Sequence, residues 1–391
     1  MIYQLIITGY YMYKNFENKF MKIFMGSLIK DSRTVNLQLN SSFLPVLFLI
    51  FSVLSFNSMY AQKPMRAGTT TANFLEIGFG AAGNALGDAY VSMVNDVSAI
   101  YWNPAGLSVT ENNEAMFVAQ PWIAGINSSY SAVAINIAGI GTLGLGFINV
   151  DYGEMDVTTL AMQEGTGEKF SASDKAFILS YGRRLADWFT FGTSAKYISS
   201  SIWHMNANSI AFDLGVIINT PFFSVTGKNE DGINIGMSIS NYGLPMKYDG
   251  MDLLNTIDIS PGEAGNYQDV AGQFKLQEWE LPLIFRIGAS YNPLVYGNHI
   301  VTISVNALHP NNNSESVNVG LQYSVSIPSF GKFFARGGYK ALFMDDSQYG
   351  LSLGFGILTT LLYNNGIKFD YAYRDVGILG GTHCYGVSVM F

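Results

Sequence analysis

The feature of this sequence that most constrains its fold is an alternation of apolar with small or polar residues, repeated through most of the chain. In YGLSLGFGI, at 349–357, Tyr, Leu, Leu, Phe and Ile alternate with Gly and Ser. The stretches VNVGLQYSVSI at 317–327 and IKFDYAYR at 367–374 follow the same pattern. A period of two residues is typical of β-strands, whose successive side chains point to opposite faces. The chain is therefore expected to be an all-β protein.

Composition decides between two architectures that share this alternation, a soluble β-sandwich and a membrane barrel. Charged residues make up 13% of the chain and aromatic residues 14%, whereas about 25% of a typical soluble domain is charged. In a soluble sandwich the polar face is solvated and should carry many charges, but here that face is mostly Gly, Ser and Asn. Apolar residues toward lipid and small or polar residues toward a lumen are typical of an outer-membrane β-barrel.

Fourteen alternating segments can be counted, each about as long as the 9–11 residues that a tilted strand needs to cross a bilayer. An even number of strands closes a bacterial barrel with both ends on one side of the membrane. We therefore predict a transmembrane barrel of about 14 antiparallel strands, near residues 114–123, 127–138, 142–152, 175–184, 187–202, 207–219, 232–241, 280–291, 299–308, 315–327, 332–342, 348–358, 366–375 and 382–391.

The connections between these segments favour the same fold. The two longest, Gly153–Asp174 and Tyr242–Trp279, follow odd-numbered strands, whereas short turns such as Gly139–Gly141 follow even-numbered strands. Long loops on the extracellular side and short turns on the periplasmic side are the arrangement of outer-membrane barrels. The connection Pro221–Asp231 is longer than this arrangement predicts for an even position.

An apolar run near the N-terminus indicates export. Phe43–Phe56 is an uncharged run that is too short to span a bilayer comfortably as a helix, and SMYAQ follows at 58–62. This pattern predicts a secretory signal peptide within residues 1–61, with Gln62 as the first mature residue and Met21 or Met25 as candidate starts. An uncleaved N-terminal anchor is the alternative. With the barrel pattern, a signal peptide predicts the outer membrane of a Gram-negative bacterium.

The chain ends on an apolar alternation and not on a polar tail. In THCYGVSVMF, at 382–391, one face is formed by Tyr385, Val387, Val389 and Phe391. We interpret this stretch as the last strand, which pairs with the first strand and turns that face to lipid. A terminal aromatic residue of this kind resembles the signal that the barrel-assembly machinery recognises. The alternative is a soluble β-protein that happens to end on Phe.

Motifs for catalysis or cofactor binding are weak. Gly78–Gly83 fits G-x-G-x-x-G, but that pattern indicates dinucleotide binding only between a strand and a helix of a βαβ unit. The four histidines lack zinc-ligand spacing, Cys384 is the single cysteine, and the loop carboxylates of Asp151 and Glu154 lack EF-hand spacing. No nucleophile, base and orienting group can be assembled. We predict no enzyme activity, no cofactor and no metal, and a net charge of −8 predicts no nucleic-acid partner.

Strand parity predicts a group of charged side chains inside the lumen. These are Lys196, Asp213, Arg286, Arg336, Lys340, Lys368, Asp370 and Arg374. Buried charges need partners, and both signs occur on neighbouring strands. The favoured interpretation is a salt-bridged network that holds a plug, and the alternative is a path for a solute.

The stretch before the first strand is neither strand-like nor a linker. Phe74–Ser108 is rich in small residues and contains one compact turn element, formed by Asn103, Pro104, Ala105 and Gly106. Proline restrains the residue before it, so a short preceding helix is expected to end there. A structured segment of this length is a candidate lumen plug. We therefore predict a hatch over residues 62–112 and a barrel over residues 113–391.

The same residues resemble a known family. The pattern FLEIG…GDAYVS…ND.SAIYWNPAGL, within 74–107, is similar to the opening of the PorV/PorQ family of outer-membrane proteins, and the Asn-Pro-Ala-Gly element is shared more loosely with FadL-type transporters. The resemblance implies a FadL-like fourteen-stranded barrel with an N-terminal hatch and a host of the Bacteroidetes type. Relatives often carry Arg in a Gly-Ala-Arg triplet where Ala82 stands, which implies a different tether for the hatch of this chain.

Two functions of different class remain open. The resemblance implies service to the type IX secretion system by binding secreted cargo or a surface partner, and the partly apolar loop Tyr242–Trp279 suits this role. The alternative is a FadL-like transporter of small hydrophobic compounds, which predicts an apolar pocket under the loops and a lateral gap in the wall. The expected partners are outer-membrane lipid, the barrel-assembly machinery and, for the first function, secreted cargo or secretion-system proteins. The sequence slightly favours the first function, through the resemblance alone.

Overall fold

The computed structural model describes residues 66–110, 112–265, 269–328, 330–344, 347–360 and 365–391. The predicted signal peptide and the candidate start sites lie outside the described residues. All described residues belong to one compact unit that begins at Lys63. Among them, no helix is long and apolar enough to cross a membrane.

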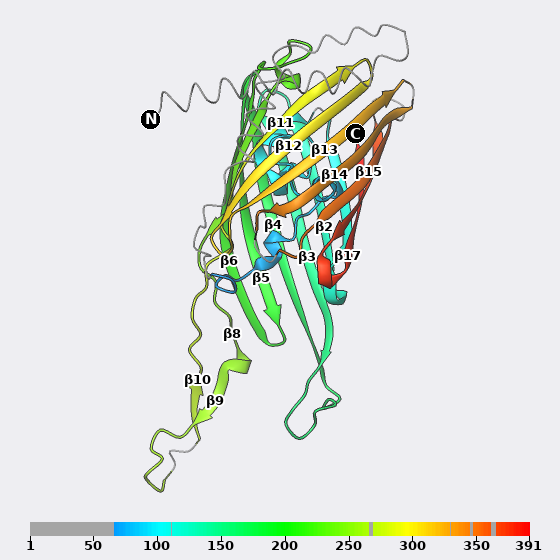
Figure 1. The fold of residues 1–391 in the computed structure, drawn as a ribbon. Helices are drawn as coiled ribbons and strands as arrows, with labels where there is room; N and C mark the ends of the chain where they lie inside the picture. Colours follow the sequence, from blue (N-terminus) through cyan, green and yellow to red (C-terminus); the bar gives the residue numbers. More distant parts are fainter. Residues whose placement is uncertain (1–65, 111, 266–268, 329, 345–346, 361–364) are drawn as a thin grey trace, which may run out of the picture. The chain divides into compact units, whose positions relative to one another are not determined.

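The unit is a closed barrel of fourteen antiparallel strands (Figure 1). The strands are β1 (Glu114–Pro121), β2 (Asn127–Ile137), β3 (Gly141–Asp156), β4 (Lys169–Ala186), β5 (Phe189–Ile202), β6 (Met205–Asn219), β7 (Asn234–Gly243), β11 (Ile284–Tyr296), β12 (His299–Pro310), β13 (Ser316–Ile327), β14 (Gly331–Leu342), β15 (Leu351–Thr360), β16 (Gly366–Asp375) and β17 (Gly381–Met390). Each strand pairs with the next along this order, and β1 pairs with β17 to close the wall. The predicted fold and strand number are confirmed.

Strands β3 and β4 extend beyond their predicted limits at the loop side, and β11 continues past its predicted end to Tyr296. The ladder between β3 and β4 continues to Asp156 and Lys169, where a loop was expected over Gly153–Asp174. The added residues include a surface ion pair, with Lys169 Nζ 3.4 Å from Glu154 Oε2. The extension contains one apolar pair, Met155 and Phe170, between polar neighbours, and an alternation this short does not identify a strand in the sequence.

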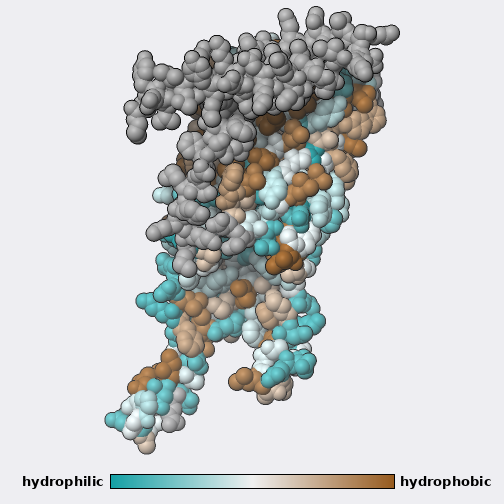
Figure 2. Space-filling view, in the orientation of Figure 1, coloured by the Kyte–Doolittle hydropathy of each residue, from teal (hydrophilic) through white to brown (hydrophobic). Residues whose placement is uncertain are grey.

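The strands divide their side chains between two faces, as the alternation predicted. On β17, Tyr385, Val387 and Val389 are 42–45% exposed, whereas Cys384 and Ser388 are buried. Phe391 is also exposed, and its backbone N–H donates to the carbonyl oxygen of Asn113 at 3.0 Å. Figure 2 shows apolar residues over the strands of one side of the barrel. The role of this strand end as an assembly signal stays a prediction.

The two ends of the barrel differ. The connection between β3 and β4 and the connection between β7 and β11 both project from one end, which we call the loop end (Figure 1). The second of these contains β8 (Asp249–Gly250), η5 (Met251–Leu253), β9 (Leu254–Ile257) and β10 (Val270–Gln273). The opposite end, which we call the turn end, holds the shorter connections, although η4 (Asn229–Asp231) lies in a longer one. The short helices η3 (Ile123–Gly125) and η7 (Gly377–Leu379) lie in loop-end connections.

Candidate functional site

A segment that precedes the barrel passes through its lumen from end to end. At the loop end, the backbone N–H of Thr71 donates to the carbonyl oxygen of Glu280 at 3.0 Å. At the turn end, Asn136 Nδ2 donates to the carbonyl oxygen of Thr110 at 3.4 Å. Residues 66–110, the lumen segment, carry four short helices: η1 (Asn73–Glu76), α3 (Ala81–Ala85), α4 (Ala99–Trp102) and η2 (Pro104–Val109).

The predicted turn element ties the lumen segment to the wall. Asn103 is fully buried, and its Nδ2 donates to the carbonyl oxygens of Val91, at 2.9 Å, and Val216 of β6, at 3.2 Å. Its Oδ1 accepts from the backbone N–H of Ala105 at 3.2 Å. One side chain therefore joins two parts of the lumen segment to the barrel and shapes the first turn of η2, where Pro104 occupies the first position.

Three glycines of the wall give this element the room it needs. Gly182 of β4, Gly192 of β5 and Gly215 of β6 are direct partners in the strand register. A β-carbon at Gly192 would overlap the backbone of Pro104, and one at Gly215 would overlap Asn103 Oδ1. Further glycines that lie against the lumen segment on other strands include Gly144, Gly146, Gly236, Gly288, Gly320, Gly338 and Gly354.

A buried ion cluster holds the middle of the lumen segment. Lys340 Nζ of β14 lies 2.7 Å from Asp88 Oδ2, and Arg374 of β16 pairs with the other oxygen of the same carboxylate. Arg374 also donates to Asn84 Oδ1 at 2.8 Å. Burial opposes ionisation of Asp88, but Arg374 and Lys340 hold the pKa of its carboxyl below its ordinary value. The basic tether thus comes from the wall, and Ala82 is a buried apolar residue.

A second buried cluster lies around the start of α4. Lys368 Nζ of β16 is 2.8 Å from Asp96 Oδ2 and 3.1 Å from Asp370 Oδ2. Asp370 also pairs with Arg336 of β14 at 2.6 Å. Asp96 Oδ1 accepts from the backbone N–H of Ser98 at 3.0 Å, which places a carboxylate at the N-terminus of the helix.

Two of the remaining predicted lumen charges, Lys196 and Asp213, form a third cluster within the wall. Lys196 Nζ lies 2.7 Å from both Asp213 Oδ2 and Asn241 Oδ1. Arg286 donates to Ser240 Oγ at 2.8 Å. The structure therefore places all eight predicted charges in buried positions inside the barrel. Sequence reasoning missed Asp88 and Asp96, because strand parity does not extend to an irregular segment.

The lumen-facing side of β1 to β5 is mainly apolar, although it also carries the buried Glu114 and Lys196, whereas the opposite side carries most of the basic groups. Buried apolar side chains from the first strands include Val118, Tyr130, Ile148, Ala176, Ile178 and Ile198. The opposite wall, from β11 to β16, carries the basic side chains of the first two clusters together with Arg286. Four partly buried apolar residues pack against the core near the loop end: Trp122, Ile126, Tyr152 and Tyr248. Every neighbouring pair of the fourteen strands is hydrogen-bonded in the described part of the chain, and several ladders are interrupted by register shifts, as between Phe212 and Leu214 of β6. The lateral gap expected for a transporter stays a prediction.

The weaker motifs have structural roles. Gly78–Gly83 does not follow a strand, and a β-carbon at Gly83 would lie 2.5 Å from the ring of Trp102, so close packing explains this glycine. Each histidine ring forms a hydrogen bond with one side chain, as where His383 Nδ1 lies 2.9 Å from the hydroxyl of Tyr371. Within the described residues, no group of three metal-ligating side chains comes together.

Comparison with solved structures identifies barrels of the same fold. The CymD monoaromatic hydrocarbon channel is 11% identical with a TM-score of 0.53, and the match covers 80% of this chain and 97% of that chain. The Pseudomonas putida toluene transporter TodX is 11% identical with a TM-score of 0.50, covering 80% and 96%. A Pseudomonas aeruginosa FadL homologue is 10% identical with a TM-score of 0.48, covering 80% and 98%.

The first two of these proteins are a monoaromatic hydrocarbon channel and a toluene transporter. No family model matches the sequence, and no curated protein matches it significantly. Membership of the PorV/PorQ family, which Phe74–Ser108 resembles, therefore stays a prediction. The matches to CymD and TodX show the fold, and the chain is a closed fourteen-stranded β-barrel of the outer-membrane type.

Proposed function

We propose that this barrel admits small hydrophobic compounds across the outer membrane. The observation that carries the proposal is the match to two hydrocarbon channels over 80% of this chain and nearly the whole of theirs. The mainly apolar lumen face of β1 to β5 supports it, because a hydrophobic solute can bind such a surface without losing its favourable apolar contacts.

The lumen segment lies in the path that a compound would take through the barrel. It contacts strands on both sides of the lumen, through η2 on β4 to β6 and through α3 on β14 to β17. A compound that enters past Trp122 and Tyr248 would meet this segment before it reached the turn end. Passage therefore requires the lumen segment to shift while the fourteen strands stay paired. We infer a gated route and not an open pore.

The proposal predicts that polar substitutions at the loop-end entrance reduce uptake. Trp122→Gln combined with Tyr248→Gln should lower the rate of radiolabelled toluene uptake several-fold in cells that depend on this barrel, because both side chains form part of the apolar entrance. The measurement compares initial uptake rates at equal amounts of heat-modifiable barrel. Tyr296→Gln, at an exposed turn-end position, is the matched control. Equal uptake by cells with and without the wild-type protein would reject the proposed function.

A second candidate function is supported by the projecting arm, residues 249–274. The large apolar side chains exposed on it include Met251 at 70%, Leu254 at 61%, Ile259 at 62% and Phe274 at 59%. The arm is attached at its base, where β8 pairs with β6 and Gln273 Nε2 donates to Asp249 Oδ1 at 2.8 Å. An exposed apolar surface on a fixed support suits a protein partner. This supports docking of secreted cargo or secretion-system proteins, as the resemblance to PorV/PorQ implies.

Removing the outer part of the arm separates the two candidates. The backbone N–H of Phe274 donates to the carbonyl oxygen of Leu253 at 3.0 Å, so residues 254–272 can be replaced by two glycines while Gln273 still donates to Asp249 of β8. For a docking role, this deletion should leave barrel folding intact and reduce secretion of proteins that carry a type IX signal, measured by quantifying them in culture medium. Shortening the β3–β4 connection over 157–168 is the control. Normal secretion with lost toluene uptake would reject docking in favour of transport.

A further inference from the structure

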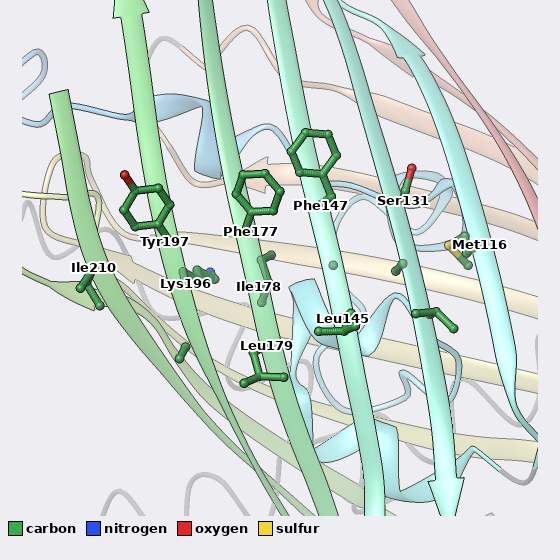
Figure 3. A pocket seen from close by; sticks show the side chains of 14 residues that line it. Met116, Ser131, Leu145, Phe147, Phe177, Ile178, Leu179, Lys196, Tyr197 and Ile210 are labelled. Atoms are coloured by element: carbon green, nitrogen blue, oxygen red, sulfur yellow. The ribbon is translucent and has the colours of Figure 1, made fainter. Parts of the chain in front are cut away.

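The outer surface of the barrel is hollowed on the side formed by β1 to β6. The depression has a volume of about 670 Å³ and is lined mainly by apolar residues (Figure 3). Leu145, Phe177, Leu179, Tyr197 and Ile210 line it and are 47–57% exposed, so it opens outward and not into the lumen. Since the chain lies in the outer membrane, this surface faces lipid.

An aromatic row borders the depression toward the loop end. Phe147, Phe177 and Tyr197 are direct partners on β3, β4 and β5, and Figure 3 shows all three rings on the same side of the sheet. The rings of Phe147 and Phe177 have centroids 4.7 Å apart. Aromatic side chains gather at the level of lipid headgroups in membrane barrels. This row therefore indicates the interface of the outer leaflet.

The next outward-facing row toward the loop end is polar. It contains Asn149, Lys175 and Ser199, which are direct partners on the same three strands. Two residues along a strand correspond to about 7 Å, so the Lys175 ammonium lies within reach of headgroups above the aromatic rings. Lys175 is exposed, and among the described residues it forms no ion pair. Asp151, one row further out, has its Oδ1 engaged by the backbone N–H of Gly153 at 3.0 Å.

We propose that this surface binds an outer-leaflet lipid that carries a phosphate group. Its acyl chains occupy the depression, and its phosphate lies against Lys175, with Asn149 and Ser199 as hydrogen-bond donors. The charge argues for a phosphate, because an ammonium without a carboxylate partner at the interface attracts anionic headgroups. The shape argues for acyl chains, because a protein partner or a free phosphate would not fill a depression inside the lipid-facing band.

Native mass spectrometry of the purified full-length barrel tests this proposal, with diphosphorylated lipid A as the probe and enzymatically dephosphorylated lipid A as its control. The wild type should retain the phosphorylated lipid preferentially. Lys175→Gln should abolish that preference, and Ala195→Trp, which fills the depression, should reduce retention of both lipids several-fold. Lys275→Gln in a loop and Leu214→Trp on the outer face of β6 are matched controls that should behave as wild type. Heat modifiability verifies that each variant is folded.

Two results would overturn the proposal. Equal retention of the two lipids by the wild type would show that no phosphate is recognised. Unchanged phosphate preference in Lys175→Gln, or unchanged retention in Ala195→Trp, would show that the lipid binds elsewhere. Neither result depends on uptake of hydrophobic compounds, so the proposed transport function is tested separately.

Discussion

Replacing Gly192 with valine is expected to convert a closed barrel into one that conducts ions. The position faces the lumen, and a β-carbon there would overlap the backbone of Pro104. A contact with the backbone cannot be relieved by rotation of a side chain. The turn element at 103–106 must therefore move away from the strands of the wall. Single-channel recording in planar bilayers should show step conductances for Gly192→Val where the wild type shows none.

The control for this prediction is a glycine that faces lipid. Gly337 lies on β14, and a β-carbon there would meet its nearest atom, Leu353 Cδ2, at 3.4 Å, which is an ordinary contact with a movable side chain. Gly337→Val should therefore remain closed and equally well folded. If Gly192→Val is folded and as closed as the wild type, the lumen segment is not what blocks the lumen at this level.

The second large effect is expected at Asp88, which neutralises two basic residues. Asp88→Asn leaves Arg374 and Lys340 buried without their counter-charge, and breaking a buried ion pair from one side costs about 3–5 kcal/mol. Chemical unfolding of the purified barrel should show a loss of this size. Glu154→Gln breaks the exposed pair with Lys169 and should cost less than about 1 kcal/mol. Adding Lys340→Met to Asp88→Asn should restore part of the loss, and equal stability of all variants would contradict a role for this cluster.

The same cluster predicts a dependence on pH. The pKa of Asp88 in the folded protein lies below its ordinary value, so the folded state favours the ionised carboxylate. Its stabilisation is present above the pKa of the unfolded chain, about 3.9, and is lost as the pH falls through the folded pKa. The stability difference between the wild type and Asp88→Asn should therefore shrink below about pH 4.

Strand periodicity predicted the parts of this molecule that repeat and failed where repetition ends. It predicted the cluster residues that belong to the strands, such as Lys368 and Arg374, because every second residue of a strand faces the lumen. It could not place Asp88 or Asp96, since their positions depend on turns and short helices with no fixed period. The predicted apolar content of the β7–β11 loop is only partly exposed, because Leu253 turns inward at the base of the arm.

The length of the extramembrane strands was also beyond sequence reasoning. Glu154 and Lys169 belong to a ladder in which polar residues alternate with the single apolar pair Met155 and Phe170, and so short an alternation cannot be told from a loop in the sequence. The outer-wall depression was missed for a different reason. It arises from large and small outward side chains on five adjacent strands, and the register between strands is needed to see that Ala195 lies beside Leu179.

The threaded lumen segment has a consequence for how the barrel is made. The closing ladder joins the first strand to the last, Glu114 opposite Met390, so it forms only after nearly the whole chain is available, and such non-local pairing is slow. The lumen segment precedes every strand in the order of synthesis. It presses against Gly192 and Gly338 on nearly opposite walls, which leaves no clearance for insertion into a finished cylinder. The sheet is therefore expected to close around the lumen segment during folding. The segment would then act as an internal template, and its size would determine the circumference of the barrel.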